Sequence, residues 1–235
     1  MSTIPKKNII VTGASGNLGR AVVARLLADG HRVIAASRNG GNDNTSASGD
    51  QYESHRIDLA DEKAASAFVA AVVEKHKTID AALLLAGGYA GGTIKDTGSE
   101  LIRKMIALNF ETAYHVARPA FNQMMQQSTG GRIVLVGART ALRARDGANN
   151  LAYGLSKSLV LRLAEVLNAE GASHNVVTAA IIPSTIDTPD NRAAMPKADF
   201  TKWVRPEDIA ATIAFILSES GKVLRETVLK VYGDA

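Results

Sequence analysis

Short apolar runs alternate with amphipathic stretches along this chain, and that alternation constrains its fold more than any other feature. Strands of a parallel sheet are covered on both faces, so they appear in a sequence as continuous apolar runs. Seven runs fit this description, the third of them weakly: 8–11, 32–36, 54–57, 80–85, 132–136, 175–182 and 227–231. The pattern predicts an α/β fold, a single doubly wound parallel sheet of about seven strands with helices on both faces.

Apolar residues at helical spacing fill the stretches between these runs. We expect helices over 19–29, 61–76, 99–126 and 151–170, and a last helix that begins at Pro206. Pro119 predicts a kink in the long third helix, because a proline removes a backbone hydrogen bond. The Gly-, Asn- and Ser-rich segment 39–49 is expected to be a mobile loop. No linker and no internal repeat interrupts the pattern, so residues 1–235 are expected to form one domain.

Composition excludes several classes of function. Cysteine is absent and the five histidines lack ligand spacing, so no metal site is expected. The net charge of +4 comes from scattered residues, and aromatic residues make up 5%, unlike a nucleic-acid groove. No apolar run reaches the roughly 18 residues of a membrane span, and the first residues lack the apolar core of a signal peptide. We expect a cytoplasmic protein that acts on a small molecule, without nucleic acid or membrane.

A glycine-rich turn joins the first strand to the first helix. It reads Thr12-Gly13-Ala14-Ser15-Gly16-Asn17-Leu18-Gly19. Glycines at such a turn let a diphosphate approach backbone N–H groups at the start of a helix. The turn makes the expected sheet a Rossmann-type sheet that binds a dinucleotide. The residues predicted to line the diphosphate are Gly13, Ser15, Gly16, Asn17, Leu18 and Gly19.

The end of the second strand bears on the choice of dinucleotide. An Asp or Glu at this place holds the ribose 2′-hydroxyl of NAD, but here the strand ends Ala36-Ser37-Arg38. A guanidinium pairs with a 2′-phosphate through two charge-assisted bonds, whereas a carboxylate would repel it. Ser37 and Arg38 therefore favour NADP(H) over NAD(H).

Two further strand ends lie at the edge of the sheet where ligands bind. Asp58 and Leu59 follow the third run, where the carboxylate can accept a hydrogen bond from an adenine amino group. A helix N-cap or a turn is an equal alternative for Asp58. Ala86, Gly87 and Gly88 follow the fourth run, where missing side chains leave room for the adenosine ribose.

Tyr153 and Lys157 stand four residues apart in the helix expected over 151–170. This spacing places a phenol and an ammonium on one helix face, about 5–6 Å apart at their Cβ atoms. We expect the ammonium to lower the pKa of the phenol, which is near 10 in free tyrosine. The pair is then suited to general acid catalysis on a carbonyl or imine that receives a hydride.

The glycine turn, Asn109, the Tyr153/Lys157 pair and the segment 183–188 resemble the short-chain dehydrogenase/reductase family over essentially the whole chain. The resemblance implies that Tyr153 donates the proton and that Lys157 also holds the nicotinamide ribose. It implies that Asn109 anchors a relay water, and that Pro183, Ser184, Ile186 and Thr188 cover the nicotinamide. It further implies helix-to-helix assembly into a homodimer or homotetramer.

Three stretches look like one branch of this family, the quinonoid dihydropteridine reductases: 86–92, 137–142 and 187–203. The catalytic serine of the family falls on Ala138, and that branch also lacks it. Thr140 offers a competing placement, 13 residues before Tyr153. The branch uses NADH, with an acid after the second strand, and lacks a helix asparagine, so Arg38 and Asn109 depart from it.

Two departures from the wider family concern the sheet centre and the glycine turn. Asn17 stands in the glycine turn where the main pattern has glycine. Leu84-Leu85 replaces the usual asparagine pair, which removes polar support from the centre of the sheet.

Tyr89 and Trp203 are candidates to stack on a flat substrate, with packing as the alternative. The leading interpretation is an NADP(H)-dependent reductase of a carbonyl or quinonoid substrate. Its rivals are dihydropteridine reductase itself and a non-catalytic, nucleotide-sensing regulator.

Overall fold

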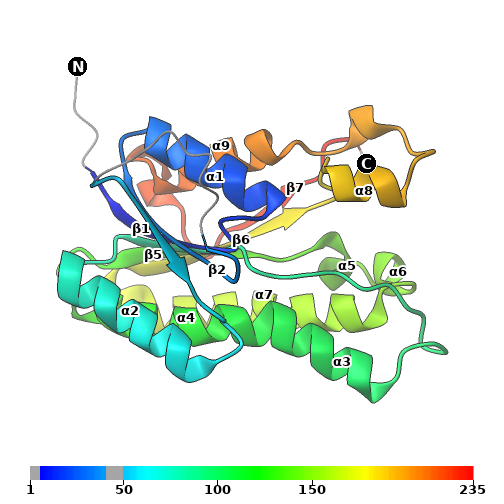
Figure 1. Ribbon diagram of the computed structural model, residues 1–235, viewed down its shortest axis with the longest axis horizontal. Coiled ribbons are helices and arrows are strands. Elements are labelled where there is room, and N and C mark those ends of the chain that lie inside the picture. Colours follow the sequence, from blue (N-terminus) through cyan, green and yellow to red (C-terminus); the bar gives the residue numbers. More distant parts are fainter. Residues whose placement is uncertain (1–5, 41–49, 235) are drawn as a thin grey trace.

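A seven-stranded sheet runs through the centre of the protein. The computed structural model describes residues 6–40 and 50–234. Every neighbouring pair of strands is parallel, in the order β3-β2-β1-β4-β5-β6-β7 (Figure 1). The strands are β1 (Asn8–Thr12), β2 (Arg32–Ser37), β3 (Tyr52–Arg56), β4 (Ala81–Leu84), β5 (Gly131–Val136), β6 (Val176–Pro183) and β7 (Val228–Val231). The predicted doubly wound sheet is confirmed.

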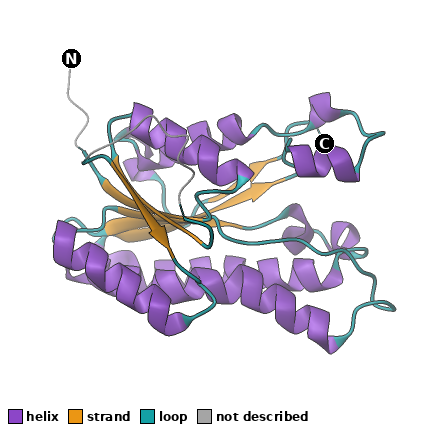
Figure 2. Ribbon diagram, in the orientation of Figure 1, coloured by secondary structure: helices purple, strands orange, loops and turns teal. Residues whose placement is uncertain are grey.

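Helices cover both faces of this sheet (Figure 2). One face carries α1 (Asn17–Ala28) and α9 (Pro206–Leu217), and the other carries α2 (Glu62–His76), α4 (Thr112–Gln126) and α7 (Leu151–Gly171). Successive strand residues point to opposite faces, so Ile9 and Val11 pack with α1 and α9, while Ile10 packs with α2 and α4. Two buried apolar layers result, and they hold the strand ends rigidly in place.

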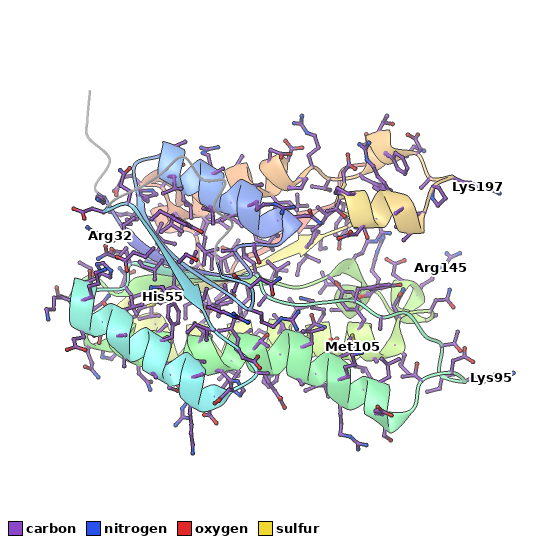
Figure 3. All side chains as sticks on the ribbon, in the orientation of Figure 1. Arg32, His55, Lys95, Met105, Arg145 and Lys197 are labelled. Carbon is purple, nitrogen blue, oxygen red and sulfur yellow. The ribbon has the colours of Figure 1, made fainter. Side chains whose placement is uncertain are left out.

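Short helices gather beyond one end of the sheet. They are α3 (Ser99–Ile106), α5 (Arg139–Leu142), α6 (Ala144–Gly147) and α8 (Pro189–Ala194), together with the 3₁₀ turn Phe200–Lys202, which packs on α8. The 3₁₀ turns Ala172–His174 and Ser220–Val223 lie elsewhere. Figure 3 labels Met105 of α3, which is almost fully buried, and Arg145 of α6 at this end. The sequence pattern did not predict α5, α6 or α8, because four to six residues are too few to show helical periodicity.

The predicted helix over 99–126 is present with these bounds, but its hydrogen-bond pattern is not uniform. The structure has α3, then a π-helical turn over Ala107–Glu111, then α4, which continues through Pro119 to Gln126. The change of pattern lies at the π turn, and the kink expected at Pro119 stays a prediction. Residues around Pro119, among them Val116 and Ala120, are fully buried, and this packing stabilises the helix across the proline. Most of the loop expected over 39–49 lies outside the described residues.

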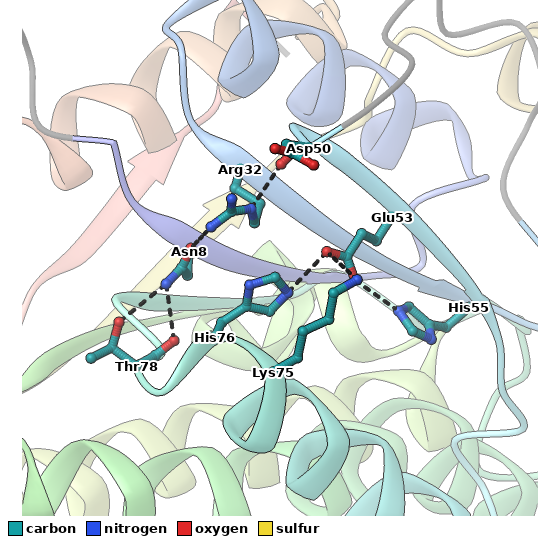
Figure 4. Close-up of polar contacts among 8 residues, drawn as sticks. All are labelled: Asn8, Arg32, Asp50, Glu53, His55, Lys75, His76 and Thr78. Atoms are coloured by element: carbon teal, nitrogen blue, oxygen red, sulfur yellow. Dashed lines mark hydrogen bonds and ion pairs between the residues drawn. The ribbon is translucent and has the colours of Figure 1, made fainter.

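Polar contacts stabilise β3, whose sequence has little apolar character. Glu53 of β3 pairs with Lys75 at 3.0 Å and with His76 at 2.9 Å, both at the end of α2 (Figure 4). Burial by itself would raise the pKa of Glu53, but Lys75 and His76 hold it below its usual value. On the neighbouring strands, Arg32 donates to Asn8 Oδ1 at 2.9 Å. The Glu53 contacts therefore fix the weak edge strand β3 to α2, and the Arg32 contact links β2 to β1.

Among the described residues, no helix combines the length and apolar character needed to cross a bilayer.

Candidate active site

The glycine turn lies where β1 ends and α1 begins. Gly13 has a φ of +66°, a conformation that favours glycine, and its N–H donates to Ala36 O at 2.9 Å. A Cβ at Gly13 would come within 2.9 Å of Ala86 N, and one at Gly19 would overlap Gly13 O. The glycines therefore permit a close approach between this turn, the start of α1 and the end of β4.

The first turn of α1 is free of negative charge. Gly16 is the N-cap residue, no side chain caps the helix, and the first turn carries no acidic residue. Backbone N–H groups at such a terminus attract anions. The uncapped N–H groups fit the diphosphate of a dinucleotide. Asn17 Nδ2 donates to Asp190 Oδ2 at 3.2 Å, which ties the turn to α8 and places one carboxylate beside it.

Arg38 follows β2 as an exposed side chain, and Ser37 is buried with its hydroxyl donating to Gly40 O at 2.5 Å. Asp58 Oδ1 accepts the Ala60 N–H at 3.1 Å, so Asp58 makes the turn contact that was one of its two expected roles. The N-cap of α2 is Asp61 instead. Asp58 is exposed and Leu59 is buried beside it, and nothing in these contacts tests an adenine bond.

Side chains from other elements support the end of β4, where Leu84-Leu85 was expected to remove polar support. Thr12 Oγ1 accepts the Ala86 N–H at 3.2 Å, and Asn109 Oδ1 accepts the Gly88 N–H at 3.0 Å. A Cβ at Gly87 would lie 2.6 Å from Asn109 Oδ1 and 3.4 Å from Lys157 Nζ. The Ala86–Gly88 backbone is therefore packed directly against two predicted site residues.

Asn109 sits in the π turn and is 1% exposed. Its Nδ2 donates to Ser156 Oγ at 3.1 Å, and its second N–H points to Met105 Sδ at 4.0 Å. Sequence reasoning missed Ser156. The only signal was its place between Tyr153 and Lys157 on the same helix, three residues after the tyrosine, where one turn of helix brings it to the Tyr153 carbonyl.

Tyr153 and Lys157 lie on one face of α7, as the spacing predicted. Lys157 Nζ is 5.9 Å from the centre of the Tyr153 ring and donates to Val136 O, at the end of β5, at 2.8 Å. Burial lowers the pKa of Lys157 to about 8. Burial, followed by the charge of Tyr89, raises the pKa of Tyr153 to about 12.

The expected lowering of the phenol pKa is wrong for the protein by itself. Desolvation penalises the phenolate, and the ammonium that was expected to offset this penalty is itself desolvated and directed at a backbone carbonyl. Tyr153 therefore holds its proton throughout the neutral range. In that state it is suited to donate a proton, which is the role that the resemblance implies.

Tyr89 stands over this pair from the loop after β4. Its ring meets that of Tyr153 edge-on, with 5.2 Å between centroids, and its hydroxyl donates to Asn150 Oδ1 at 2.6 Å. Gly92 pairs with Asn150 in an isolated bridge, so the loop is fastened to the start of α7. Tyr89 remains 68% exposed, which leaves its ring open to a substrate. Asn150 is a second residue that sequence reasoning missed.

The two placements of the missing serine differ in surroundings. Ala138 is buried at the N-cap of α5 and offers no hydroxyl. Thr140 Oγ1 is buried without a hydrogen-bond partner, and Thr140 packs against Gly154 of α7. An unpaired hydroxyl next to the Tyr153 turn keeps Thr140 as a candidate to orient the substrate, although a buried atom must first rotate outwards.

The segment after β6 forms a wall above the sheet edge. Ser184 is held to the last strand, with its N–H donating to Val231 O at 3.0 Å, and Ile186 pairs with Val204. Thr188 caps α8 by accepting the Asn191 N–H at 3.2 Å. Trp203 packs on Phe200, with 4.8 Å between ring centroids. Packing is thus an evident role for Trp203, and no contact joins it to Tyr153 among those described.

These residues fit a dinucleotide along the carboxyl edge of the sheet. The glycine turn and the open start of α1 suit a diphosphate, and the bare Gly87 backbone beside Lys157 suits the far end of the same ligand. Comparison with known proteins gives the same result. The sequence model described as short chain dehydrogenase matches residues 7–199.

The chain belongs to the short-chain dehydrogenase family. It is therefore a nicotinamide-dependent oxidoreductase, as the resemblance implied. An acetoacetyl-CoA reductase from Acinetobacter sp. (strain RA3849) is 25% identical over 245 residues, which cover 97% of this chain and 97% of that protein. A dihydropteridine reductase from Dictyostelium discoideum is 29% identical over 210 residues, covering 87% of this chain and 84% of that protein.

A solved structure of a short-chain type dehydrogenase/reductase from Mycobacterium ulcerans has the same fold. It superposes on this short-chain dehydrogenase with a TM-score of 0.87 at 24% identity, covering 99% of this chain and 90% of that one. The dihydropteridine reductase is one similar protein among several reductases, so similarity by itself does not select the pterin branch.

Proposed function

We propose that this protein is an NADP(H)-dependent reductase that moves a hydride between the nicotinamide and a carbonyl or quinonoid substrate. The observation that carries the proposal is the position of Lys157, whose buried ammonium lies beside both the Tyr153 ring and the Gly87 backbone. When bound, the cofactor supplies the hydride. All further steps belong to residues of this chain.

Tyr153 donates a proton to the substrate oxygen or nitrogen. Its pKa of about 12 keeps the phenol protonated at neutral pH, and its partly buried position limits exchange with water. Lys157 supplies the positive charge beside the phenol, holds its own orientation through Val136 O, and faces the bare Gly87 backbone where a ribose would lie. Asn109 supports the Gly88 backbone, and the family resemblance gives it the further role of anchoring a relay water.

The preference for NADP(H) rests on Arg38. This side chain is exposed just beyond β2, and the strand end offers no carboxylate that would repel a 2′-phosphate. The Ser37 hydroxyl donates to Gly40 O, so it would bind the 2′-phosphate only by exchanging that bond. Gly13 to Gly19 would hold the diphosphate, Asp58 and Leu59 the adenine, and Pro183, Ser184, Ile186 and Thr188 would cover the nicotinamide.

A quinonoid dihydropterin is the second candidate substrate, and Ala138 favours it. Loss of the serine removes one hydrogen-bond donor to a developing alkoxide, worth about 1–3 kcal/mol. A quinonoid carbon–nitrogen system is already electrophilic and needs this donor less than a plain ketone does. The exposed ring of Tyr89 also offers a flat face for such a substrate.

The deciding experiment measures NADPH and NADH oxidation with chemically generated quinonoid dihydropterin and, separately, with acetoacetyl-CoA. Tyr153→Phe is the control in each case. Fast, Tyr153-dependent turnover of the pterin would make the protein a dihydropteridine reductase, and turnover of the thioester only would place it with carbonyl reductases. Tight NADPH binding, with no Tyr153-dependent turnover of any substrate, would favour the nucleotide-sensing regulator.

The same proposal takes residues 1–235 as one catalytic domain that works in the cytoplasm as a homodimer or homotetramer. Support comes from apolar side chains that α7 leaves exposed, namely Leu155, Leu159 and Val166. The outer face of a helix that is otherwise well packed suits contact with a second copy. Sedimentation analysis of the purified protein tests this part.

A further inference from the structure

Ser156 occupies a fully buried position between Tyr153 and Lys157 on α7. Its hydroxyl donates to the Tyr153 carbonyl at 2.8 Å and accepts the Asn109 Nδ2–H at 3.1 Å. Because the single hydroxyl hydrogen is used by the carbonyl, only lone pairs face Asn109. The Asn109 amide must therefore turn its NH₂ group towards Ser156.

That requirement decides which amide atom faces the end of β4. With Nδ2 on Ser156, the opposite atom is Oδ1, and it accepts the Gly88 N–H at 3.0 Å. The reverse orientation would set the Asn109 NH₂ group against the Gly88 N–H, two donors facing each other. Met105 Sδ, at 4.0 Å, is too weak an acceptor to fix the amide by itself.

The Gly87–Gly88 backbone is sensitive to this orientation because it has no spare room. The position of a Cβ on Gly87 lies 2.6 Å from Asn109 Oδ1 and 3.4 Å from Lys157 Nζ. If the Asn109 amide rotated, the Gly87 backbone packed against it would shift. The part of that backbone that lies next to the Lys157 ammonium would then change position. The contacts run without a gap from Ser156 through Asn109 to this surface.

We propose that Ser156 is a positioning residue, which orients the Asn109 amide and thereby holds the Gly87–Gly88 backbone beside Lys157 in the form that receives the nicotinamide half of NADPH. The proposal rests on the proposed function for the identity of the ligand. The orientation of Asn109 by Ser156 is a property of the protein alone, and it is measurable without substrate or cofactor.

The test compares Ser156→Ala with Ser158→Ala. Ser158 lies on the same helix, and its hydroxyl donates to Gly154 O at 3.0 Å without touching Asn109, so it is a matched control. In Ser156→Ala a buried Nδ2–H loses its acceptor, a loss that corresponds to about a tenfold change in an equilibrium. We expect amide hydrogen exchange at Gly88 to become about tenfold faster and the Kd for NADPH to rise by a similar factor. Ser158→Ala should change neither quantity.

A double-mutant cycle with Asn109→Ala separates positioning from general support. In the Asn109→Ala background, Ser156→Ala should have no further effect on NADPH affinity, since nothing remains to orient. Equal effects in both backgrounds would overturn the proposal. A lower melting temperature in Ser156→Ala, with Gly88 exchange and the Kd for NADPH unchanged, would also overturn it, because Ser156 would then be structural only.

Ser156→Cys is the second variant should Ser156→Ala fail to fold, since it keeps a weak donor and acceptor. It should give faster Gly88 exchange than the wild type, because sulfur is a weaker acceptor than a hydroxyl oxygen, and no rise would contradict the proposal. Absence of any reductase activity in the wild type would count against the proposed function. The hydrogen-exchange result at Gly88 would still decide for or against the role of Ser156.

Discussion

The Tyr89 ring stands edge-on to the Tyr153 ring, with 5.2 Å between their centroids, and is held there by a hydrogen bond from its hydroxyl to Asn150. The two tyrosines come from different ends of the site, one from the loop after β4 and the other from α7. This contact explains part of the raised pKa of Tyr153, after burial. It also places an exposed aromatic face directly beside the proposed proton donor.

Replacement of Tyr89 should therefore affect substrate binding more than the chemical step. An edge-to-face aromatic pair contributes about 0.5–1.5 kcal/mol. We expect Tyr89→Ala to raise the KM for a flat substrate several-fold, with kcat within about threefold of the wild type. Tyr89→Phe keeps the ring and loses only the bond to Asn150, so its KM should lie in between. An unchanged KM in the alanine variant would remove Tyr89 from the substrate site.

Burial of Lys157 should make the free energy of unfolding depend on pH in the alkaline range. Its pKa falls from 10.5 in the unfolded chain to about 8 in the fold, so between these values the unfolded chain binds the proton and the folded protein does not. Burial of the charged ammonium lowers the free energy of unfolding below pH 8. As pH rises from 8 towards 10.5 this penalty disappears, and the free energy of unfolding increases by up to about 3 kcal/mol.

Urea unfolding between pH 8 and pH 10 measures this effect. Above pH 10 the raised pKa of Tyr153 acts in the opposite sense, because the unfolded chain then loses its phenol proton first. We expect the free energy of unfolding of Lys157→Met to rise less across this range than that of the wild type. Lys104→Met, at an exposed site on α3, should follow the wild type. Parallel curves for all three proteins would show that Lys157 titrates normally.

The choice of cofactor should depend on Arg38. Charge-assisted bonds from a guanidinium to a phosphate contribute about 1.5–3 kcal/mol. Arg38→Asp is expected to raise the Kd for NADPH by a factor of roughly ten to a hundred while leaving that for NADH within a few-fold. Fluorescence titration with both nucleotides gives the ratio. Arg25→Ala, at the far end of α1 where Arg25 pairs with Asp29, should alter neither Kd.

A methyl group at Gly87 should displace Asn109 and so weaken cofactor binding. The added Cβ would lie 2.6 Å from Asn109 Oδ1, too close for either atom to stay in place. Because Asn109 also holds the Gly88 N–H, we expect Gly87→Ala to weaken NADPH binding about tenfold. Gly98→Ala is the matched control, since a Cβ there meets nothing within 4 Å. Equal affinity in the two variants would show that the β4 loop adapts freely.

Sequence patterns predicted most of the sheet because burial on both faces selects continuous apolar runs, whereas the two edge strands β3 and β7 are more polar and more exposed. The polar third strand was placed less well, at 54–57 instead of Tyr52–Arg56, because contacts from Glu53 to Lys75 and His76 define it. The π turn around Asn109 could not be predicted, since it breaks no composition rule. Pro119, which was expected to kink that helix, lies inside α4, and the kink stays a prediction.

The sequence by itself determined the order of the strands and the main helices, the glycine turn, and the Tyr153/Lys157 pair on one helix face. All of these depend on residues that are neighbours along the chain. Only the tertiary structure decided the pKa values of that pair, because desolvation depends on everything packed around it and here raises one pKa and lowers the other. The tertiary structure also decided that Ser156, Asn109 and Gly88 meet, since three separate elements must fold together to bring those groups within hydrogen-bonding distance.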